Sequence, residues 1–437
     1  MNKIIHILLF TLIAIIAKAQ NTYFPPLTGT TWETTTPQSL GWCTEKIDTL
    51  YNFLDNTNTK AFIVLKNGRI VLEKYYGTFT RDSAWYWASA GKTLTGFTIG
   101  IAQQEGLLKI QDTTSKYLGK GWTSLPLTQE DKITIRNQLT MTTGLNDGVA
   151  DSDCTLPACL QYKAEPNMRW AYHNAPYTML DKVVETASGS TFNMYVQNKI
   201  RSKIGMAGVF VKVGYNNVHY STARSMARFG LLLLNKGKWD ATPVLTDTAY
   251  FRQMTTTSQN INPSYGYLTW LNGKSALMVP GSQQVFQTSA SPNAPADMFS
   301  AMGKNGQIIN VIPSQGLVVI RMGNNPDNSL VPFTYCNDIW KLLSPVICNR
   351  STPVENALDT EGGTVYPNPS SDKLYIRFEK ELGHGQLVLT NQLGQIVKNK
   401  SFNGQQEELS VSDLPFGVYW LHIHSEKGNW VKKIMRN

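Results

Sequence analysis

The chain has 437 residues, which suggests two or three domains and allows a large core without help from a metal or disulfides. Apolar residues make up 42% and charged residues only 16%, a composition that excludes a disordered chain. The net charge is +9, but basic residues stand singly or in pairs such as Lys432–Lys433. We therefore predict a mildly basic surface and no nucleic-acid site.

The N-terminal residues have the pattern of an export signal. Lys3 is followed by an apolar run over residues 4–16, and Ala17-Lys18-Ala19 has the small residues of a signal-peptidase site. The run is too short for a permanent membrane anchor. We expect a signal peptide over residues 1–19 and no transmembrane segment in the mature chain. A buried N-terminal helix is the alternative.

The body of the chain, residues 20–350, mixes helical and strand patterns. In chain order these indicate a helix at 45–54, a hairpin over 61–72 with an Asn-Gly turn, a buried helix at 93–107, mainly helical segments over 112–240, strands between 266 and 322, and a closing helix at 333–347.

The C-terminal part of the chain changes character. Residues 351–363 are polar, without an apolar period, and we interpret them as a linker. Residues 364–437 contain short alternating runs separated by turn signals every eight to twelve residues. This spacing is typical of a small β-sandwich.

The five cysteines become candidates for oxidation in an exported protein. Cys154 and Cys159 bracket a short loop that a disulfide can close. Cys336 and Cys348 lie about 18 Å apart on one predicted helix, too far to pair with each other. We expect a Cys43–Cys348 disulfide and a buried free thiol at Cys336. The absence of C-x-x-C and H-E-x-x-H motifs predicts no metal site, and we expect no cofactor.

The search for a nucleophile leads to a serine–lysine pair. The G-x-S-x-G motif is absent, and only His173 and His219 lie in the body of the chain as partners for a triad. The S-x-x-K motif places both side chains on one helix face, where a neutral lysine can accept the serine proton. It occurs at Ser89–Lys92, at the start of the buried helix, and at Ser370–Lys373, in a turn that enters a strand. We therefore select Ser89 and Lys92.

Two further triplets are candidates for the same site. Y-x-N occurs four times, and only Tyr172-His173-Asn174 directly precedes a predicted helix. Lys304-Asn305-Gly306 leads into a predicted strand at 308–312, whereas the Lys-Asn-Gly at 66–68 is a hairpin turn.

In this order the three motifs resemble those of the serine β-lactamase and penicillin-binding-protein superfamily, most closely its class C branch. The segments 133–145, 169–180 and 303–313 strengthen the resemblance, which covers about residues 45–348. It implies an α+β fold with an antiparallel sheet flanked by helices and an all-helical subdomain, followed here by the small β-sandwich.

The resemblance also implies roles for individual residues. Ser89 would be the acylated nucleophile and Lys92 its base, with a pKa lowered by burial and a second cation. Tyr172, between Lys92 and Lys304, would have a lowered phenol pKa and relay protons. The N–H groups of Ser89 and Gln307 would form the oxyanion hole. The remaining residues expected at the substrate are Asn174, which would orient Lys92 or the substrate amide, Asn305, Gly306 and Trp170.

Two positions depart from the family signature. Asn305 stands where the third motif has threonine or another small residue, and Gln307 replaces a small residue. Both positions bear on the carboxylate of a β-lactam or peptide. We expect a secreted serine hydrolase that cleaves a small-molecule ester, amide or peptide through an acyl-serine. A penicillin-recognising or surface binding protein without turnover is the alternative.

The C-terminal module resembles the type IX secretion sorting domain. The segments starting at Tyr366, Asn391, Leu414 and Lys432 match that family in order. The resemblance implies export through the periplasm, the type IX secretion machinery as a partner, and a location outside the cell or on its outer surface. A carbohydrate-binding sandwich is the alternative.

Overall fold

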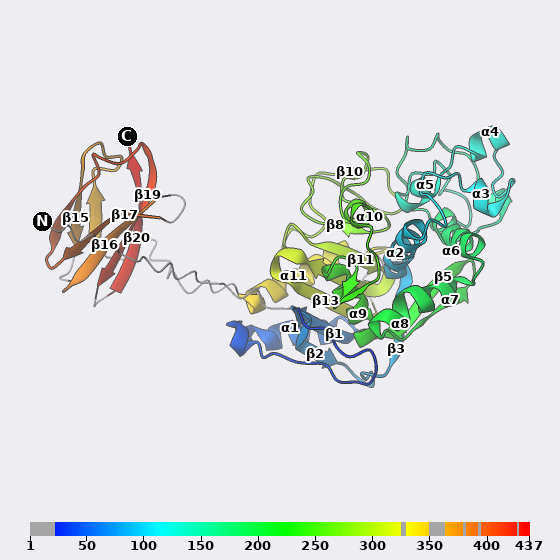
Figure 1. Ribbon diagram of the computed structural model, residues 1–437, viewed down its shortest axis with the longest axis horizontal. Coiled ribbons are helices and arrows are strands. Elements are labelled where there is room, and N and C mark those ends of the chain that lie inside the picture. The colour runs from blue at the N-terminus through cyan, green and yellow to red at the C-terminus, as the bar shows by residue number, and fades with distance from the viewer. Residues whose placement is uncertain (1–21, 325–328, 349–362, 379–381, 392–394, 426–427) are drawn as a thin grey trace, which may run out of the picture. The chain divides into compact units, whose positions relative to one another are not determined.

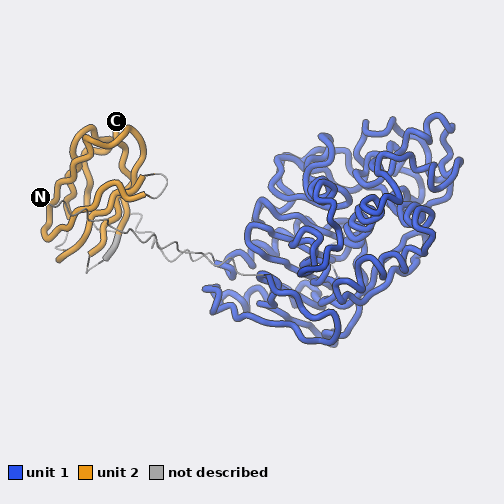
Figure 2. Tube along the Cα trace, in the orientation of Figure 1, with its two compact units in different colours: residues 1–348 blue, residues 349–437 orange. Residues whose placement is uncertain are grey.

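The computed structural model describes residues 22–324, 329–348, 363–378, 382–391, 395–425 and 428–437. The expected signal peptide lies outside the described residues, as does the expected linker apart from Gly363. The chain divides into two compact units, residues 1–348 and 349–437 (Figure 2). Each unit is described by itself.

A six-stranded antiparallel sheet forms the centre of the first unit, with the strand order β2-β1-β13-β12-β11-β8. The strands are β1 (Thr59–Lys66), β2 (Arg69–Tyr75), β8 (Trp270–Leu271), β11 (Phe299–Gly303), β12 (Gln307–Ile312) and β13 (Leu317–Gly323). Strands β12 and β13 are buried along their whole length. Their sequences are therefore continuous apolar runs and do not alternate.

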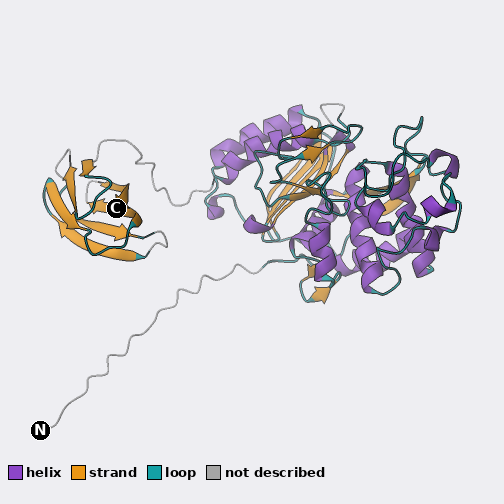
Figure 3. Cartoon of the chain, turned by 90° about the horizontal axis from the view of Figure 1, so that it is seen from above, coloured by secondary structure: helices purple, strands orange, loops and turns teal. Residues whose placement is uncertain are grey.

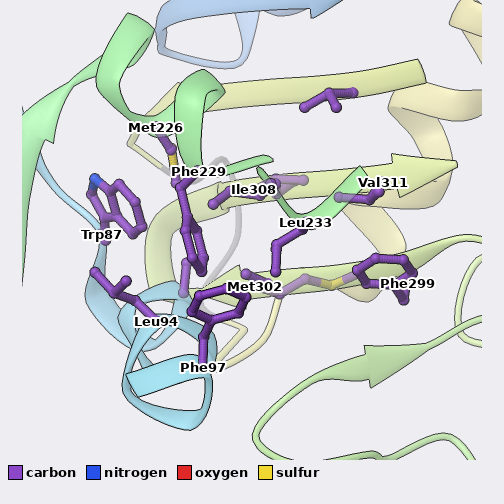
Figure 4. Close-up of a cluster of buried hydrophobic side chains, with 14 of the residues drawn as sticks. Trp87, Leu94, Phe97, Met226, Phe229, Leu233, Phe299, Met302, Ile308 and Val311 are labelled. Carbon is purple, nitrogen blue, oxygen red and sulfur yellow. The ribbon is translucent and has the colours of Figure 1, made fainter. Parts of the chain in front are cut away.

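Helices lie on both sides of this sheet (Figure 3). Helix α1 (Ile47–Asn56) packs on β1 and on α11 (Phe333–Ile347), and α9 (Ala223–Leu234) packs on β1, β12 and β13. A Cβ added at Gly230 of α9 would lie 2.5 Å from a methyl carbon of Val318, so the helix approaches the sheet more closely than any side chain allows. Phe229 and Leu233 of α9 meet β12 in the core shown in Figure 4.

Helix α2 (Gly91–Gln104) is the central helix of the unit. It is buried from Gly91 to Ala102 and packs against β11, α6 (Asn174–Ser188) and α10 (Thr248–Met254). The short 3-10 turn η3 (Ala88–Ala90) precedes it, so the helix begins two residues before the predicted start. Figure 4 shows Trp87, Leu94 and Phe97 anchoring this junction in the core.

A helical region surrounds α2, as predicted, and α6 contacts α2, α3, α5 and α7 within it. Its elements are α3 (Ser115–Leu118), α4 (Leu127–Glu130), α5 (Ile135–Leu139), α7 (Phe192–Val196), the π-helix η5 (Gln197–Arg201) and α8 (Ser202–Ile204). The short strands of the unit are β3 (Ala84–Tyr86), β4 (Val209–Val213), β5 (Asn216–Thr222), β6 (Lys238–Trp239), β7 (Thr242–Pro243), β9 (Leu277–Met278) and β10 (Val285–Phe286).

The second unit consists of two antiparallel sheets, β14-β15-β18 and β17-β16-β19-β20, around one core. The strands are β14 (Gly363–Tyr366), β15 (Lys373–Phe378), β16 (Gly385–Thr390), β17 (Ile396–Phe402), β18 (Gln406–Ser410), β19 (Gly417–Ser425) and β20 (Gly428–Arg436). Leu374, Ile376 and Phe378 of β15 alternate with exposed residues, which is the pattern of a strand with one buried face. The predicted fold class is confirmed for both units.

Both predicted disulfides are present, and Cys336 is a buried free thiol. Cys43–Cys348 joins the segment before α1 to the end of α11, and Cys154–Cys159 closes the loop before α6. Within the part of the chain that the structure describes, no helix is both long and apolar enough to cross a membrane.

Candidate active site

Ser89 lies in the η3 turn between β3 and the N-terminus of α2, with its side chain half-buried. Neighbouring bonds hold this turn, because the Trp87 amide donates to the His219 carbonyl at 2.8 Å and the Trp87 indole donates to Ser221 Oγ at 2.8 Å. Ala88 has a φ of 45°, in the left-handed region that side chains disfavour. The backbone is therefore bent sharply just before Ser89, which presents the hydroxyl at the start of α2.

The Lys92 amine is buried against that hydroxyl. Lys92 is only 3% exposed, and its Nζ lies 2.9 Å from Ser89 Oγ. Burial lowers the pKa of Lys92 to about 7, while the charge of Asp153 acts in the opposite direction. The predicted effect of burial on this pKa is confirmed, whereas the predicted second cation is not among the groups that act on Lys92. A substantial fraction of the amine is neutral at neutral pH and able to accept a proton.

Two tyrosines enclose the Lys92 amine. Its Nζ lies 4.9 Å from the ring centre of Tyr172 and 4.3 Å from that of Tyr177. The Tyr172 hydroxyl is buried and makes no hydrogen bond of good geometry to a described residue. Burial raises the pKa of Tyr172, and Ser89 and Trp270 oppose that change only in part. The predicted lowering of this pKa is therefore wrong, because burial disfavours the ionised phenol more strongly than the neighbouring groups favour it.

The third motif forms the turn between β11 and β12 and leads into β12, as predicted. Lys304–Gly306 form the turn η6, with φ of 63° at Asn305 and 73° at Gly306. Lys304 is exposed and is not among the groups that act on Lys92 or Tyr172. Asn305 Nδ2 donates to the Tyr86 hydroxyl at 2.6 Å. The structure thus brings the η6 turn, with Asn305 and the exposed residue Lys304, against η3.

The backbone that lies against Ser89 belongs to the end of β11. A Cβ added at Gly303 would lie 2.8 Å from the amide nitrogen of Ser89, so only glycine allows this approach. Gln307 pairs with Gly303 across the ladder, and its buried side chain donates to the Gly323 carbonyl at 2.5 Å. The Gln307 side chain is therefore directed toward β13 and not toward the nucleophile.

The second half of the Y-x-N motif contacts a loop residue that sequence reasoning missed. Asn174 Nδ2 donates to Asp153 Oδ1 at 2.8 Å, and Asn216 Nδ2 donates to Asp153 Oδ2 at 2.8 Å. The Asn174 oxygen is buried and receives no hydrogen bond from a described residue. Asp153 immediately precedes the disulfide residue Cys154. No sequence spacing marked Asp153, because the loop meets α6 and β5 only in the fold.

Trp170 is not at the rim of the site. It is fully buried, and its ring packs among those of Tyr172, Tyr265 and Trp270, at centroid distances of 6.3, 5.5 and 5.9 Å. The expectation that Trp170 contacts substrate is corrected accordingly: this side chain supports Tyr172 from within the core. His173 is also buried, and burial lowers the pKa of His173 to about 4, which keeps its ring neutral.

An apolar cavity of about 450 Å³ adjoins the aromatic cluster. The Phe333 ring on its wall lies 4.7 Å from the Trp270 ring, which in turn stacks on Tyr172 at 5.5 Å. Other apolar side chains of the wall are Leu277, Val279, Phe286, Leu330 and Val331. The Phe333 and Trp270 rings thus separate the cavity from Tyr172, and Ser89, Lys92 and Tyr172 are not among its lining residues.

A family model described as Beta-lactamase matches residues 54–332, which contain the serine–lysine pair and the sheet around it. The chain belongs to the beta-lactamase family. A second model, the secretion system C-terminal sorting domain, matches residues 364–437. The beta-lactamase family unit is thus followed by a type IX sorting module, which directs secretion to the cell surface or the extracellular space.

Individual relatives are distant. An uncharacterized protein of Alkalihalophilus pseudofirmus is 23% identical over 327 residues, which are 66% of this chain and 90% of that protein. A solved structure of a candidate 6-aminohexanoate-dimer hydrolase from Bacillus anthracis has a TM-score of 0.54 at 20% identity, covering 75% of this chain and 88% of that one. A candidate β-lactamase from Bacteroides dorei gives 0.56 at 18% identity, covering 70% and 99%. These two structures confirm the fold.

Proposed function

We propose that this protein is a secreted serine hydrolase of the class C β-lactamase-related type that cleaves an ester or amide through an acyl-Ser89 intermediate. One observation carries the proposal: a buried lysine amine with a pKa of about 7 lies 2.9 Å from a half-buried serine hydroxyl at a helix N-terminus. A surface lysine would stay charged and would be unable to accept the serine proton.

In the first step Lys92 accepts the proton of Ser89 while Ser89 Oγ bonds to the substrate carbonyl carbon. The carbonyl oxygen becomes an oxyanion that needs two donors. The Ser89 amide supplies one of them. Because Gly303 lies against that amide, we assign the second to the peptide N–H groups of the 303–304 segment instead of that of Gln307.

In the second step the bond to the leaving group breaks and a proton must reach the leaving oxygen or nitrogen. Tyr172 is neutral because it is buried, so its hydroxyl can donate this proton and recover one from protonated Lys92. A water molecule then loses a proton to the same pair and attacks the acyl carbon. Hydrolysis releases the acid and restores the Ser89 hydroxyl.

The substrate preference follows from what surrounds the pair. Asn305, whose Nδ2 donates to the Tyr86 hydroxyl, replaces the small residue that the family signature has at this position, so we propose a preference for esters over β-lactams. We propose that the Asn305 side chain and the Gly306 backbone contact the substrate at the entrance of the site. We propose that Asn174 holds the Asp153 loop.

The test uses the full-length protein with a fluorophosphonate probe and p-nitrophenyl butyrate. We expect one covalent adduct, mapped by peptide mass to Ser89, and multiple turnovers of the ester faster than turnover of nitrocefin. An adduct on another serine would refute the mechanism. Stoichiometric acylation of Ser89 without turnover would support the alternative, a penicillin-recognising or surface binding protein.

A further inference from the structure

Two histidines lie side by side on one strand of the second unit, which carries none of the proposed hydrolytic chemistry. His422 and His424 belong to β19 (Figure 1) and are separated in sequence by the buried residue Ile423. Because successive side chains of a strand point to opposite faces, both imidazoles stand on the outer face of the sheet. His424 is exposed and His422 is half-buried, so the pair is open to dissolved ions.

The two rings are close enough to share one metal ion. Their centres are 6.3 Å apart, and their planes differ by only 6°. A transition-metal ion binds an imidazole nitrogen at about 2.0–2.1 Å and therefore lies about 3 Å from the centre of that ring. Two rings at the observed separation can thus reach the same ion, and the exposed ring of His424 has room to rotate a nitrogen toward it.

Thr390 of β16 orients one ring of the pair. Its Oγ1 lies 3.1 Å from His422 Nε2. With the hydroxyl as acceptor, Nε2 carries the proton and Nδ1 keeps the lone pair that a metal ion needs. Histidine ligands of metal sites characteristically make such a hydrogen bond through the ring nitrogen that does not bind the metal. The contact with Thr390 therefore suits His422 to metal binding.

The two imidazoles are the protein ligands that the described residues offer at this position. His422 pairs with Val388 of β16 and Val431 of β20 in the ladders. His424 pairs with Gln386 of β16. Within the described ranges, no third histidine, cysteine, aspartate or glutamate joins the pair in a cluster that could hold a metal ion. A bound ion would therefore keep water at its other coordination positions.

We propose that His422 and His424 together bind one divalent transition-metal ion, Cu²⁺ in preference to Zn²⁺, on the outer face of β19. Imidazole is a good ligand for both ions, and the affinity of a nitrogen site along the first transition series is highest for Cu²⁺. Mg²⁺ prefers oxygen ligands and should not bind. The site belongs to the second unit, so the proposal does not depend on the hydrolase assignment.

The experiment is calorimetric titration of the full-length protein with CuCl₂, ZnCl₂ and MgCl₂ at about pH 7.5, where an imidazole of ordinary pKa is mostly neutral. We expect Cu²⁺ to bind more tightly than Zn²⁺, and Mg²⁺ not to bind. The electron paramagnetic resonance spectrum of the Cu²⁺ complex should show coupling to imidazole nitrogen. A Cu²⁺ isotherm that is the same in the double variant His422→Gln, His424→Gln would overturn the proposal.

Single variants separate chelation by the pair from binding to any exposed imidazole. His424→Gln leaves one ring of the pair and should weaken Cu²⁺ binding at least about tenfold. The melting temperature of the metal-free variant should not change, because the side chain is exposed. His384→Gln, at another exposed histidine of the same unit, is the matched control and should bind Cu²⁺ normally. Unchanged binding in His424→Gln, or an equal loss in His384→Gln, would contradict the assignment.

Discussion

The S-x-x-K motif occurs twice in this chain, and the pKa of its lysine is lowered at one position and raised at the other. At Ser89–Lys92 the lysine is buried and burial lowers its pKa to about 7. At Ser370–Lys373 the serine is buried, its Oγ donates to the Lys373 carbonyl at 2.8 Å, and the Lys373 amine pairs with Glu408 at 2.7 Å in solvent. The Glu408 carboxylate raises the pKa of Lys373. The comparison shows that burial of the amine, not the spacing of the motif, lowers the pKa of the lysine.

The largest effect should separate the two serines. Ser89→Ala is expected to lower kcat/KM for p-nitrophenyl butyrate by at least about 10³-fold, because it removes the nucleophile. Ser370→Ala should leave this value within about twofold, since its unit carries none of the proposed chemistry. Initial rates with both purified variants make the measurement. Comparable losses of kcat/KM in the two variants would contradict the distinction between the two motifs.

The two lysines should differ next. Lys92→Met is expected to reduce kcat by about 10²–10⁴-fold, the range for loss of a general base, with its fold intact by circular dichroism. Lys373→Met removes only an exposed ion pair and should leave kcat unchanged. Lys92→Arg tests charge against basicity, because arginine stays protonated. Full activity in Lys92→Arg would argue against proton transfer to this position.

Tyr172 should distinguish amides from esters. An activated ester has a leaving group that needs little protonation, whereas an amide nitrogen must receive a proton. Tyr172→Phe is therefore expected to lower amide turnover by about 10²-fold more than ester turnover. The measurement compares p-nitrophenyl butyrate with the anilide of the same acid. Equal losses on both substrates would make Tyr172 a structural residue or a base common to both reactions.

The smallest effect concerns the pH profile. Because the pKa of Lys92 is lowered to about 7, the rate for the ester should rise with pH through about 7, as the neutral amine becomes populated. Asp153 acts to raise that pKa, so Asp153→Asn should move the midpoint to lower pH. Asp131→Asn, an exposed aspartate on the surface, serves as the control. A midpoint that stays fixed or moves upward would show that Asp153 does not act on Lys92.

Local sequence patterns were sufficient to predict much of the fold. The continuous apolar runs at β12 and β13 predicted two buried strands, and the Asn-Gly turn predicted the hairpin of β1 and β2. The serine–lysine spacing predicted the 2.9 Å contact because i and i+3 share a face where η3 leads into α2.

The parts that failed depend on contacts between distant segments. Strand β11 reads Phe-Ser-Ala-Met-Gly, with little strand character, so its bounds were not predicted, whereas the strand that follows the Lys304–Gly306 turn was. The burial of Trp170 comes from packing against rings such as that of Trp270, about a hundred residues away, and the raised pKa of Tyr172 comes from its burial in the same ring cluster. No local spacing encodes those neighbours.

The Cys43–Cys348 disulfide has a mechanical consequence. Residue 348 is the last of the first unit, and the chain continues from it toward the sorting module. A force applied to that module, during export or by an anchor at the cell surface, would be transmitted to the first unit at Cys348. The bond to Cys43 passes the load covalently to the segment before α1, so α11 cannot be peeled from its C-terminal end. Force applied through the C-terminal module would therefore not unfold α11 from its C-terminal end.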